Sequence, residues 1–181
     1  AILEEIGYKS GMGHSLNSIG NVYYVKGEYD KALDYFDRSL AILEEIGHKR
    51  GMGESLNSIG IVHSDKGDYK KAEEYLEKSA TVQMELDSSI AFETAFYLFL
   101  SNKILGKEYN IAEIQTLIKE KEEIGYNINY RLYQLLEDTS YLETAYNQIQ
   151  EKADNLEPDV KLKFLSYPIP KAIVEEWEKV K

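Results

Sequence analysis

The strongest constraint on the fold of this chain is an internal duplication. Residues 1–40 align without a gap on residues 41–80, and 25 of the 40 positions are identical. The agreement is densest where AILEEIGYKSGMG recurs as AILEEIGHKRGMG. A fixed period of this length is typical of solenoids, in which each unit buries its apolar face only by stacking on its neighbours. The duplication therefore predicts a stack of similar units.

Each unit has the pattern helix, turn, helix. Apolar residues at helical spacing predict a first helix over about 13–26, and Gly27 marks the turn after it. A second helix runs through residues 32–43, and Gly47 suits the left-handed position that commonly ends a helix. The second unit repeats the same signals at Leu56, Ile59, Val62, Gly67, Tyr69, Ala72, Leu76 and Ala80.

Two glycines lie inside predicted helices at the same place in each unit. Gly20 and Gly60 each cost about 1 kcal/mol relative to alanine in a helix interior. Because this cost recurs at the same phase, we expect a close helix crossing at both positions. Ala32 and Ala72 are the small residues expected on the opposing helix.

These residues resemble the tetratricopeptide repeat, in a longer form of 40 residues. The resemblance is carried in the first unit by Leu16, Ile19, Gly20, Tyr23, Gly27, Tyr29, Ala32 and Phe36. It departs from the family pattern at His63, which replaces an aromatic residue, and at Ser39 and Ser79, where alanine is common. No proline closes either unit. The resemblance implies a right-handed stack of antiparallel helical hairpins that binds other proteins.

The fold class expected from this resemblance is all-α, a solenoid of helical hairpins with a divergent helical cap at the C-terminal end. The repeats occupy residues 1–87. They comprise a partial unit over 1–12 and two repeats over about 13–47 and 53–87. Residues 88–125 are expected to form a degenerate third hairpin that turns at Gly106.

The region 126–181 is expected to be the C-terminal cap. Helices are predicted over about 127–137 and 139–155, with Asp138 or Thr139 capping the second of them. A final helix is predicted to begin near Pro170, since proline suits the first turn of a helix. Its apolar stripe is expected to cap its own chain, with docking on another subunit as the alternative. The stripe consists of Ile169, Ile173, Val174, Trp177 and Val180.

The first seven residues repeat residues 41–47, which end a second helix. We therefore expect residues 1–7 to be the tail of a unit whose beginning is absent. Solenoid ends normally carry a polar cap, and this end has none. Its apolar face is expected to be exposed or paired with a second copy, which predicts self-association through the N-terminal edge.

Composition excludes several classes of function. The net charge of −11 disfavours nucleic-acid binding, which needs cationic neutralisation of phosphate, and it disfavours acidic membrane surfaces. No apolar run reaches the roughly 18 residues of a membrane helix. The chain has no cysteine, so it forms no disulfides, which fits a reducing compartment. A cytoplasmic location is expected.

No catalytic, metal or cofactor site is expected from the sequence. None of the three histidines has a partner histidine three or four residues away on a helix. The paired carboxylates lie in helical stretches among lysines, which is typical of a solvated face. The glycines of SGMGHSLNSIG follow no strand and carry no Gly-Lys-Ser or Gly-Lys-Thr element, so they do not match a phosphate loop. A non-enzymatic protein is therefore predicted.

The candidate binding residues follow from the same resemblance. Asn17 and Asn57 occupy the phase that faces the concave groove in this family, and amide side chains can bond an extended peptide backbone. The alternative is that these residues are ordinary polar positions or bond adjacent repeats together. The candidate peptide-contacting residues are His14, Asn17, Asn21, Tyr24, Glu54, Asn57, Ile61, Ser64 and Tyr97.

Three functions are compatible with this interpretation. The first is a module that binds a peptide or protein segment in its concave groove. The second is a regulatory arm, because the C-terminal segment resembles the tails of bacterial adenylate or guanylate cyclases that carry such repeats. The third is a sensor that closes around a peptide pheromone.

Overall fold

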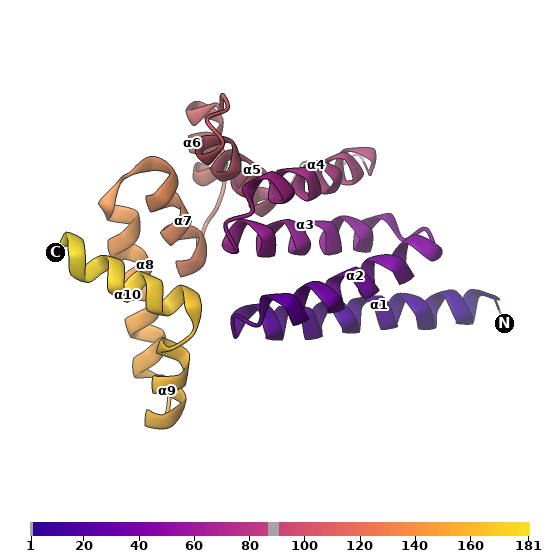
Figure 1. Ribbon diagram of the computed structural model, residues 1–181, viewed down its shortest axis with the longest axis horizontal. Coiled ribbons are helices and arrows are strands. Elements are labelled where there is room, and N and C mark those ends of the chain that lie inside the picture. The colour runs from indigo at the N-terminus through magenta and orange to yellow at the C-terminus, as the bar shows by residue number, and fades with distance from the viewer. Residues whose placement is uncertain (1, 87–90) are drawn as a thin grey trace. The chain divides into compact units, whose positions relative to one another are not determined.

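A computed structural model describes residues 2–86 and 91–181 (Figure 1). These residues form ten α-helices and no β-strand, which confirms the all-α fold class. The chain divides into two compact units. The first comprises residues 1–24 and 28–110, and the second comprises residues 25–27 and 111–181.

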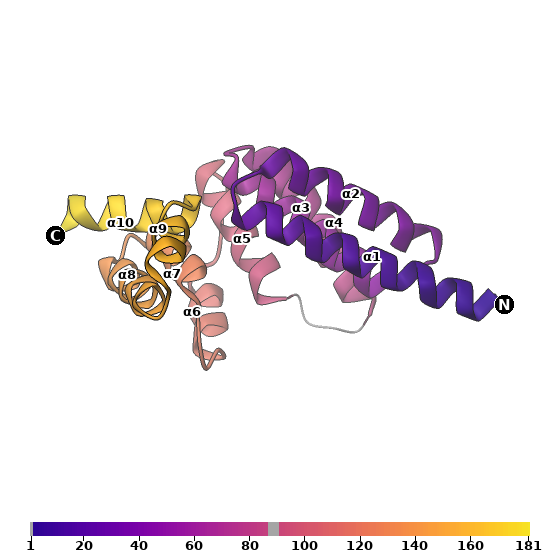
Figure 2. The ribbon, with the colours of Figure 1, turned by 90° about the horizontal axis from the view of Figure 1, so that it is seen from below.

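The first unit is built from successive antiparallel helices. Neighbouring helices lie side by side in two perpendicular views, α1 against α2 and α3 against α4 (Figures 1 and 2). The core that joins the two hairpins gathers Ala32 and Phe36 of α2 with Ile59 and Val62 of α3. The helices are α1 (Ile2–Val25), α2 (Tyr29–Glu45), α3 (Lys49–Asp65), α4 (Tyr69–Glu85) and α5 (Phe92–Ile104).

Glycine ends the predicted helices where the period requires it. Gly47 has φ +67° and Gly67 has φ +80°, a left-handed conformation that glycine adopts without strain. The next helices then begin at polar caps. The side chain of His48 accepts a hydrogen bond from the main-chain N–H of Gly51, and Asp68 accepts one from Lys71. The predicted cap at Gly47 is confirmed.

The crowded crossings expected at Gly20 and Gly60 are also confirmed. A Cβ atom at Gly20 would lie 2.6 Å from the Phe36 ring, and one at Gly60 would lie 2.6 Å from Leu76 Cγ. The closest neighbours are therefore large side chains rather than the small residues predicted. Ala72 contributes through its main-chain oxygen, 3.3 Å from the position of a Cβ at Gly60.

The expected break between residues 1–7 and the first helix is wrong. Helix α1 runs without interruption from Ile2 to Val25, although its first residues repeat a segment that turns at Gly47. A Cβ at Gly7 would meet nothing within 4 Å. The same holds at Gly47, which does end a helix, so the space beside the glycine does not decide which copy of the segment turns.

The second unit contains the remaining helices. Its core comprises Leu142, Ala145 and Ile149 of α8 together with Phe164 and Ile173 from the two helices after α8. The helices are α6 (Ile111–Lys119), α7 (Tyr126–Leu136), α8 (Thr139–Asp154), α9 (Pro158–Leu165) and α10 (Pro168–Val180).

The bounds of the two helices predicted for the cap region agree closely with those of α7 and α8. Asp138 caps α8, since its side chain accepts a hydrogen bond of 2.9 Å from the main-chain N–H of Ser140. A hydrogen bond from the Ser140 side chain, together with this main-chain bond, lowers the pKa of the Asp138 carboxyl. The final helix starts at Pro168, two residues before Pro170, which lies in its first turn, and α9 was not predicted.

The predicted third hairpin lies across the division between the units. Helix α5, a glycine turn with φ +69° at Gly106, and helix α6 follow in the expected order. Contacts assign α5 to the first unit and α6 to the second. The predicted boundary between residues 87 and 88 lies outside the described residues.

Within residues 2–86 and 91–181, no helix is both long enough and apolar enough to cross a membrane.

Candidate functional site

The candidate residues form one row on α1 and one row on α3, and the two rows lie side by side. The α1 row consists of His14, Asn17, Asn21 and Tyr24, and the α3 row consists of Glu54, Asn57, Ile61 and Ser64. Near the start of the rows, His14 Nδ1 lies 3.8 Å from Glu54 Oε2. Near their end, the Tyr24 hydroxyl donates a hydrogen bond of 2.7 Å to the Asp65 carboxylate. These two contacts are ten residues apart on α1, so the rows stay together for about three helical turns.

Several of these side chains reach solvent. The side chains of His14 and Glu54 are each 45% exposed, and Asn21 is exposed as well. Asn17 and Ile61 are half-buried. The part of the surface that solvent reaches therefore carries an imidazole, a carboxylate and the Asn21 amide, with Asn17 and Ile61 half-buried beside them.

The Asn57 side chain of α3 is hydrogen-bonded to helix α5, which follows the second hairpin. Its amide oxygen accepts a hydrogen bond of 2.9 Å from the Thr94 hydroxyl of α5. Gln83 donates to the same Thr94 oxygen at 3.1 Å and to the Ser79 hydroxyl at 3.0 Å. Asn57 therefore joins adjacent helices, as the alternative interpretation of the asparagines expected.

Asn17 has the same position in the first hairpin but different surroundings. Its amide oxygen is buried and has no hydrogen-bond partner among the residues that the structure describes. In the second hairpin the partner of Asn57 is Thr94, and the residue 40 positions before Thr94 is Glu54. Glu54 cannot take that role, because its carboxylate has no hydrogen to donate.

Two candidate residues are buried. Ser64 is 3% exposed and Tyr97 is 2% exposed, so neither side chain faces a partner in this structure. Ser64 lies on α3 and its hydroxyl has no partner among the described residues. Tyr97 packs against Phe96 on α5, with ring centroids 5.7 Å apart. The expectation that these two side chains contact a peptide is corrected accordingly.

The prediction missed two residues that help build the surface. Asp65 bonds Tyr24, and Thr94 bonds Asn57. Thr94 follows His14 and Glu54 at the 40-residue period. Extending the repeat register into α5 would have placed it beside Asn57, but the rest of α5 has lost the repeat pattern.

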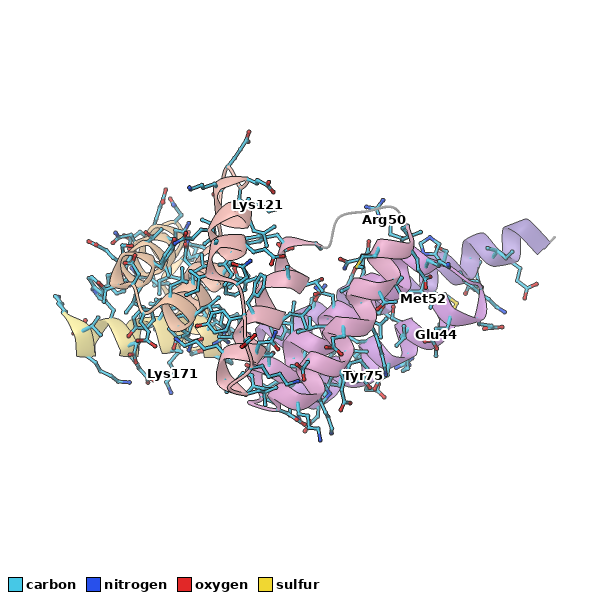
Figure 3. The ribbon with its side chains drawn as sticks, turned by 90° about the horizontal axis from the view of Figure 1, so that it is seen from above. Glu44, Arg50, Met52, Tyr75, Lys121 and Lys171 are labelled. Carbon is cyan, nitrogen blue, oxygen red and sulfur yellow. The ribbon has the colours of Figure 1, made fainter. Side chains whose placement is uncertain are left out.

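The side chains of this surface can form hydrogen bonds with a ligand. In the described part of the chain, no three His, Asp or Glu side chains come together as metal ligands. Arg50, in the first turn of α3 (Figure 3), donates a hydrogen bond of 3.3 Å to Glu54 and adds one cation beside the row. Amide, imidazole and carboxylate groups in a row suit the main-chain groups of an extended peptide.

Comparison with known proteins agrees with the repeated helical hairpins. The model of the family described as "Tetratricopeptide repeat" matches residues 12–85. No curated protein matches the chain. Tetratricopeptide repeats generally mediate protein–protein interaction, and a fold of this kind is typically a non-catalytic module. The hairpins α1–α2 and α3–α4, which carry the candidate surface, are therefore similar to tetratricopeptide repeats over residues 12–85.

Proposed function

We propose that this protein binds an extended segment of a partner protein along the rows of α1 and α3. The observation that carries the proposal is the pairing of the rows, with His14 beside Glu54 at one end and Tyr24 bonded to Asp65 at the other. Both rows fall inside the region matched by the repeat family. The exposed polar groups between these contacts are available to a ligand.

The contact residues of this proposal are fewer than the sequence suggested. His14, Asn17, Asn21, Glu54 and Ile61 remain as ligand contacts. Tyr24 and Asn57 are half-buried as well, but they are hydrogen-bonded to Asp65 and Thr94. An extended segment leaves its main-chain groups unpaired, and the exposed amide of Asn21 can both donate to its carbonyls and accept from its N–H groups. Ile61 adds one apolar contact. Asn57 supports the surface from behind through Thr94.

A random decapeptide library displayed on phage would test the proposal. The library is selected against the full chain and each recovered peptide is titrated by fluorescence anisotropy. We expect the double variant Asn17→Ala/Asn21→Ala to weaken binding by about tenfold or more, which corresponds to two or three lost hydrogen bonds.

The matched control changes polar residues away from the rows. Asp34→Ala/Lys78→Ala alters exposed side chains of α2 and α4 and is expected to leave the affinity within about twofold. Peptides whose affinity is the same for the wild type and for Asn17→Ala/Asn21→Ala would place the binding surface elsewhere.

The cyclase-arm and pheromone-sensor hypotheses use the same surface and differ in the response to a bound peptide. A sensor that closes around its peptide predicts a smaller radius of gyration with the selected peptide bound, measured by small-angle X-ray scattering. A binding module without closure predicts no such change. A cyclase arm predicts that the peptide alters the activity of a cyclase domain expressed in the same polypeptide.

A further inference from the structure

The first hairpin has an open apolar groove on a different side of α1 from the binding rows. The groove has a volume of about 630 Å³ and is lined by Met12, Ser15, Leu16 and Ile19 of α1 and by Arg38 and Ile42 of α2. Ile19 is 41% exposed, and Val22, one turn further along α1, is 53% exposed. Exposed aliphatic side chains gathered on one helix face mark an interaction surface.

The chain holds a second copy of this face with its occupant in place. Residues 51–60 of α3 repeat residues 11–20 of α1, with Glu54 in place of His14 as the single difference. In this copy Ile59 is 1% exposed and Val62 is fully buried. The same side chains are thus covered on α3 and open on α1.

Helix α2 covers the face of α3. The Ser39 hydroxyl lies 3.1 Å from the Ser55 hydroxyl, and Phe36 shares a core cluster with Ile59. Further along, Leu43 lies so close to Gly51 that a Cβ there would be 2.9 Å from Leu43 Cδ1. The buried stripe of α2 consists of Ala32, Phe36, Ser39 and Leu43.

We propose that the open face of α1 binds an amphipathic helix that carries the stripe of α2. That stripe has a small residue, an aromatic residue, a serine and a leucine at positions i, i+4, i+7 and i+11. Because the face is nearly identical on α1 and α3, a helix that fits one fits the other. Ser15 meets the serine of the incoming helix, as Ser55 meets Ser39.

The occupant is an amphipathic helix of a partner protein rather than a described helix of a second copy of this chain. In the first unit, the α2 stripe is at most 1% exposed, and its α4 counterparts Leu76 and Ser79 are fully buried. A second copy would have to unpack its own core to offer either helix. This proposal goes beyond peptide binding at the rows, because it uses a different side of α1.

A synthetic peptide of residues 28–46, with blocked ends, tests the proposal against the full chain by isothermal titration calorimetry. We expect binding that Ile19→Glu in the chain weakens by about tenfold or more, since a charge then faces the incoming helix. Leu43→Glu in the peptide should have the same effect. Met84→Glu, at a 59% exposed position of α4, is the matched control and should leave binding unchanged.

A tethered version removes the cost of folding an isolated helix, which is marginal at this length. Residues 1–7 already repeat residues 41–47, so adding residues 28–40 before Ala1 completes a second copy of the α2 sequence. The extended chain should melt at a higher temperature, and Ile19→Glu should lower its melting temperature by more than it does in the 181-residue chain.

Three results would overturn the proposal. In the first, the extended chain melts at the original temperature and Ile19→Glu acts equally in both chains. In the second, the peptide binds the Ile19→Glu chain as tightly as the wild type, which means that it displaces α2 instead. In the third, sedimentation equilibrium shows a dimer of the 181-residue chain that Ile19→Glu dissociates, which assigns the face to self-association.

Discussion

The side-chain hydroxyl of Ser39 donates a hydrogen bond of 2.7 Å to the main-chain carbonyl oxygen of Gly13. Ser79 makes the same bond to Gly53 at 2.8 Å in the second hairpin. Both serines are fully buried. They occupy positions where alanine is common in tetratricopeptide repeats. In this chain a buried hydrogen bond therefore joins the two helices of each hairpin.

Replacing Ser39 by alanine should lower the free energy of unfolding by about 1 to 2 kcal/mol, because two buried hydrogen bonds are lost. The bonds are those to Gly13 and to Ser55. Urea denaturation followed by circular dichroism measures the change. Ser18→Ala is the control, since the exposed Ser18 hydroxyl bonds only its own helix at His14. An equal loss of unfolding free energy in the two variants would show that the buried hydrogen bonds of Ser39 do not stabilise the fold.

Gly7 and Gly47 are equivalent positions of the repeated segment AILEEIG, and replacing each by alanine should change the stability of the chain in opposite directions. Gly7 lies within α1 with free space around it, so Gly7→Ala should stabilise the chain by up to about 1 kcal/mol. Gly47 has φ +67° and equally free space, so Gly47→Ala should destabilise it by about 1 to 2 kcal/mol through the backbone alone.

Thermal unfolding of both glycine variants checks this prediction. Loss of stability in Gly7→Ala would indicate that α1 breaks at residue 7 in solution, as the repeat pattern suggested.

The two asparagines should differ in their effect on stability. Asn57→Ala removes the hydrogen bond from Thr94 and should cost about 1 kcal/mol. Asn17→Ala removes an amide oxygen without a partner in the described residues and should leave stability unchanged or slightly higher. Chemical denaturation separates the two. If Asn17→Ala lost as much stability as Asn57→Ala, Asn17 would be a structural residue and the proposed contact with a peptide would lose its support.

The stability of the fold should decrease as the pH falls below neutral. Burial lowers the pKa of His63 below 6.5, and the nearby cations Lys71 and Lys66 act in the same direction while Asp68 and Asp37 oppose it. The unfolded chain therefore binds a proton more readily than the folded one, so this contribution is complete above about pH 6.5. It decreases as the pH falls through 6.5 toward the lowered value.

His63→Tyr is the matched variant for this pH dependence. It restores the residue found 40 positions earlier, where Tyr23 stacks on Tyr35 as His63 stacks on Tyr75. The fall in melting temperature between pH 8 and pH 5.5 should be smaller in this variant. An unchanged pH profile would assign the loss of stability to other groups.

Much of the fold could be predicted from the sequence because its signals are local. The period locates the hairpins, and glycine at residues 47 and 67 ends their helices because the left-handed conformation excludes most other residues. The aspartate at 138 begins α8 for a similarly local reason. The register of the two rows follows from the helical repeat, and two contacts show that the rows lie side by side.

Contacts between helices decided the features that differ between identical positions of the two repeats. One sequence, AILEEIG, continues a helix at residue 7 and ends one at residue 47. Asn57 has a partner and Asn17 does not, and Ile59 is buried where Ile19 is open, although each pair is identical in type and phase. Propensity and periodicity are the same for both members of a pair. Only the packing of a neighbouring helix distinguishes them, since burial and hydrogen bonding depend on which atoms the fold brings together in space.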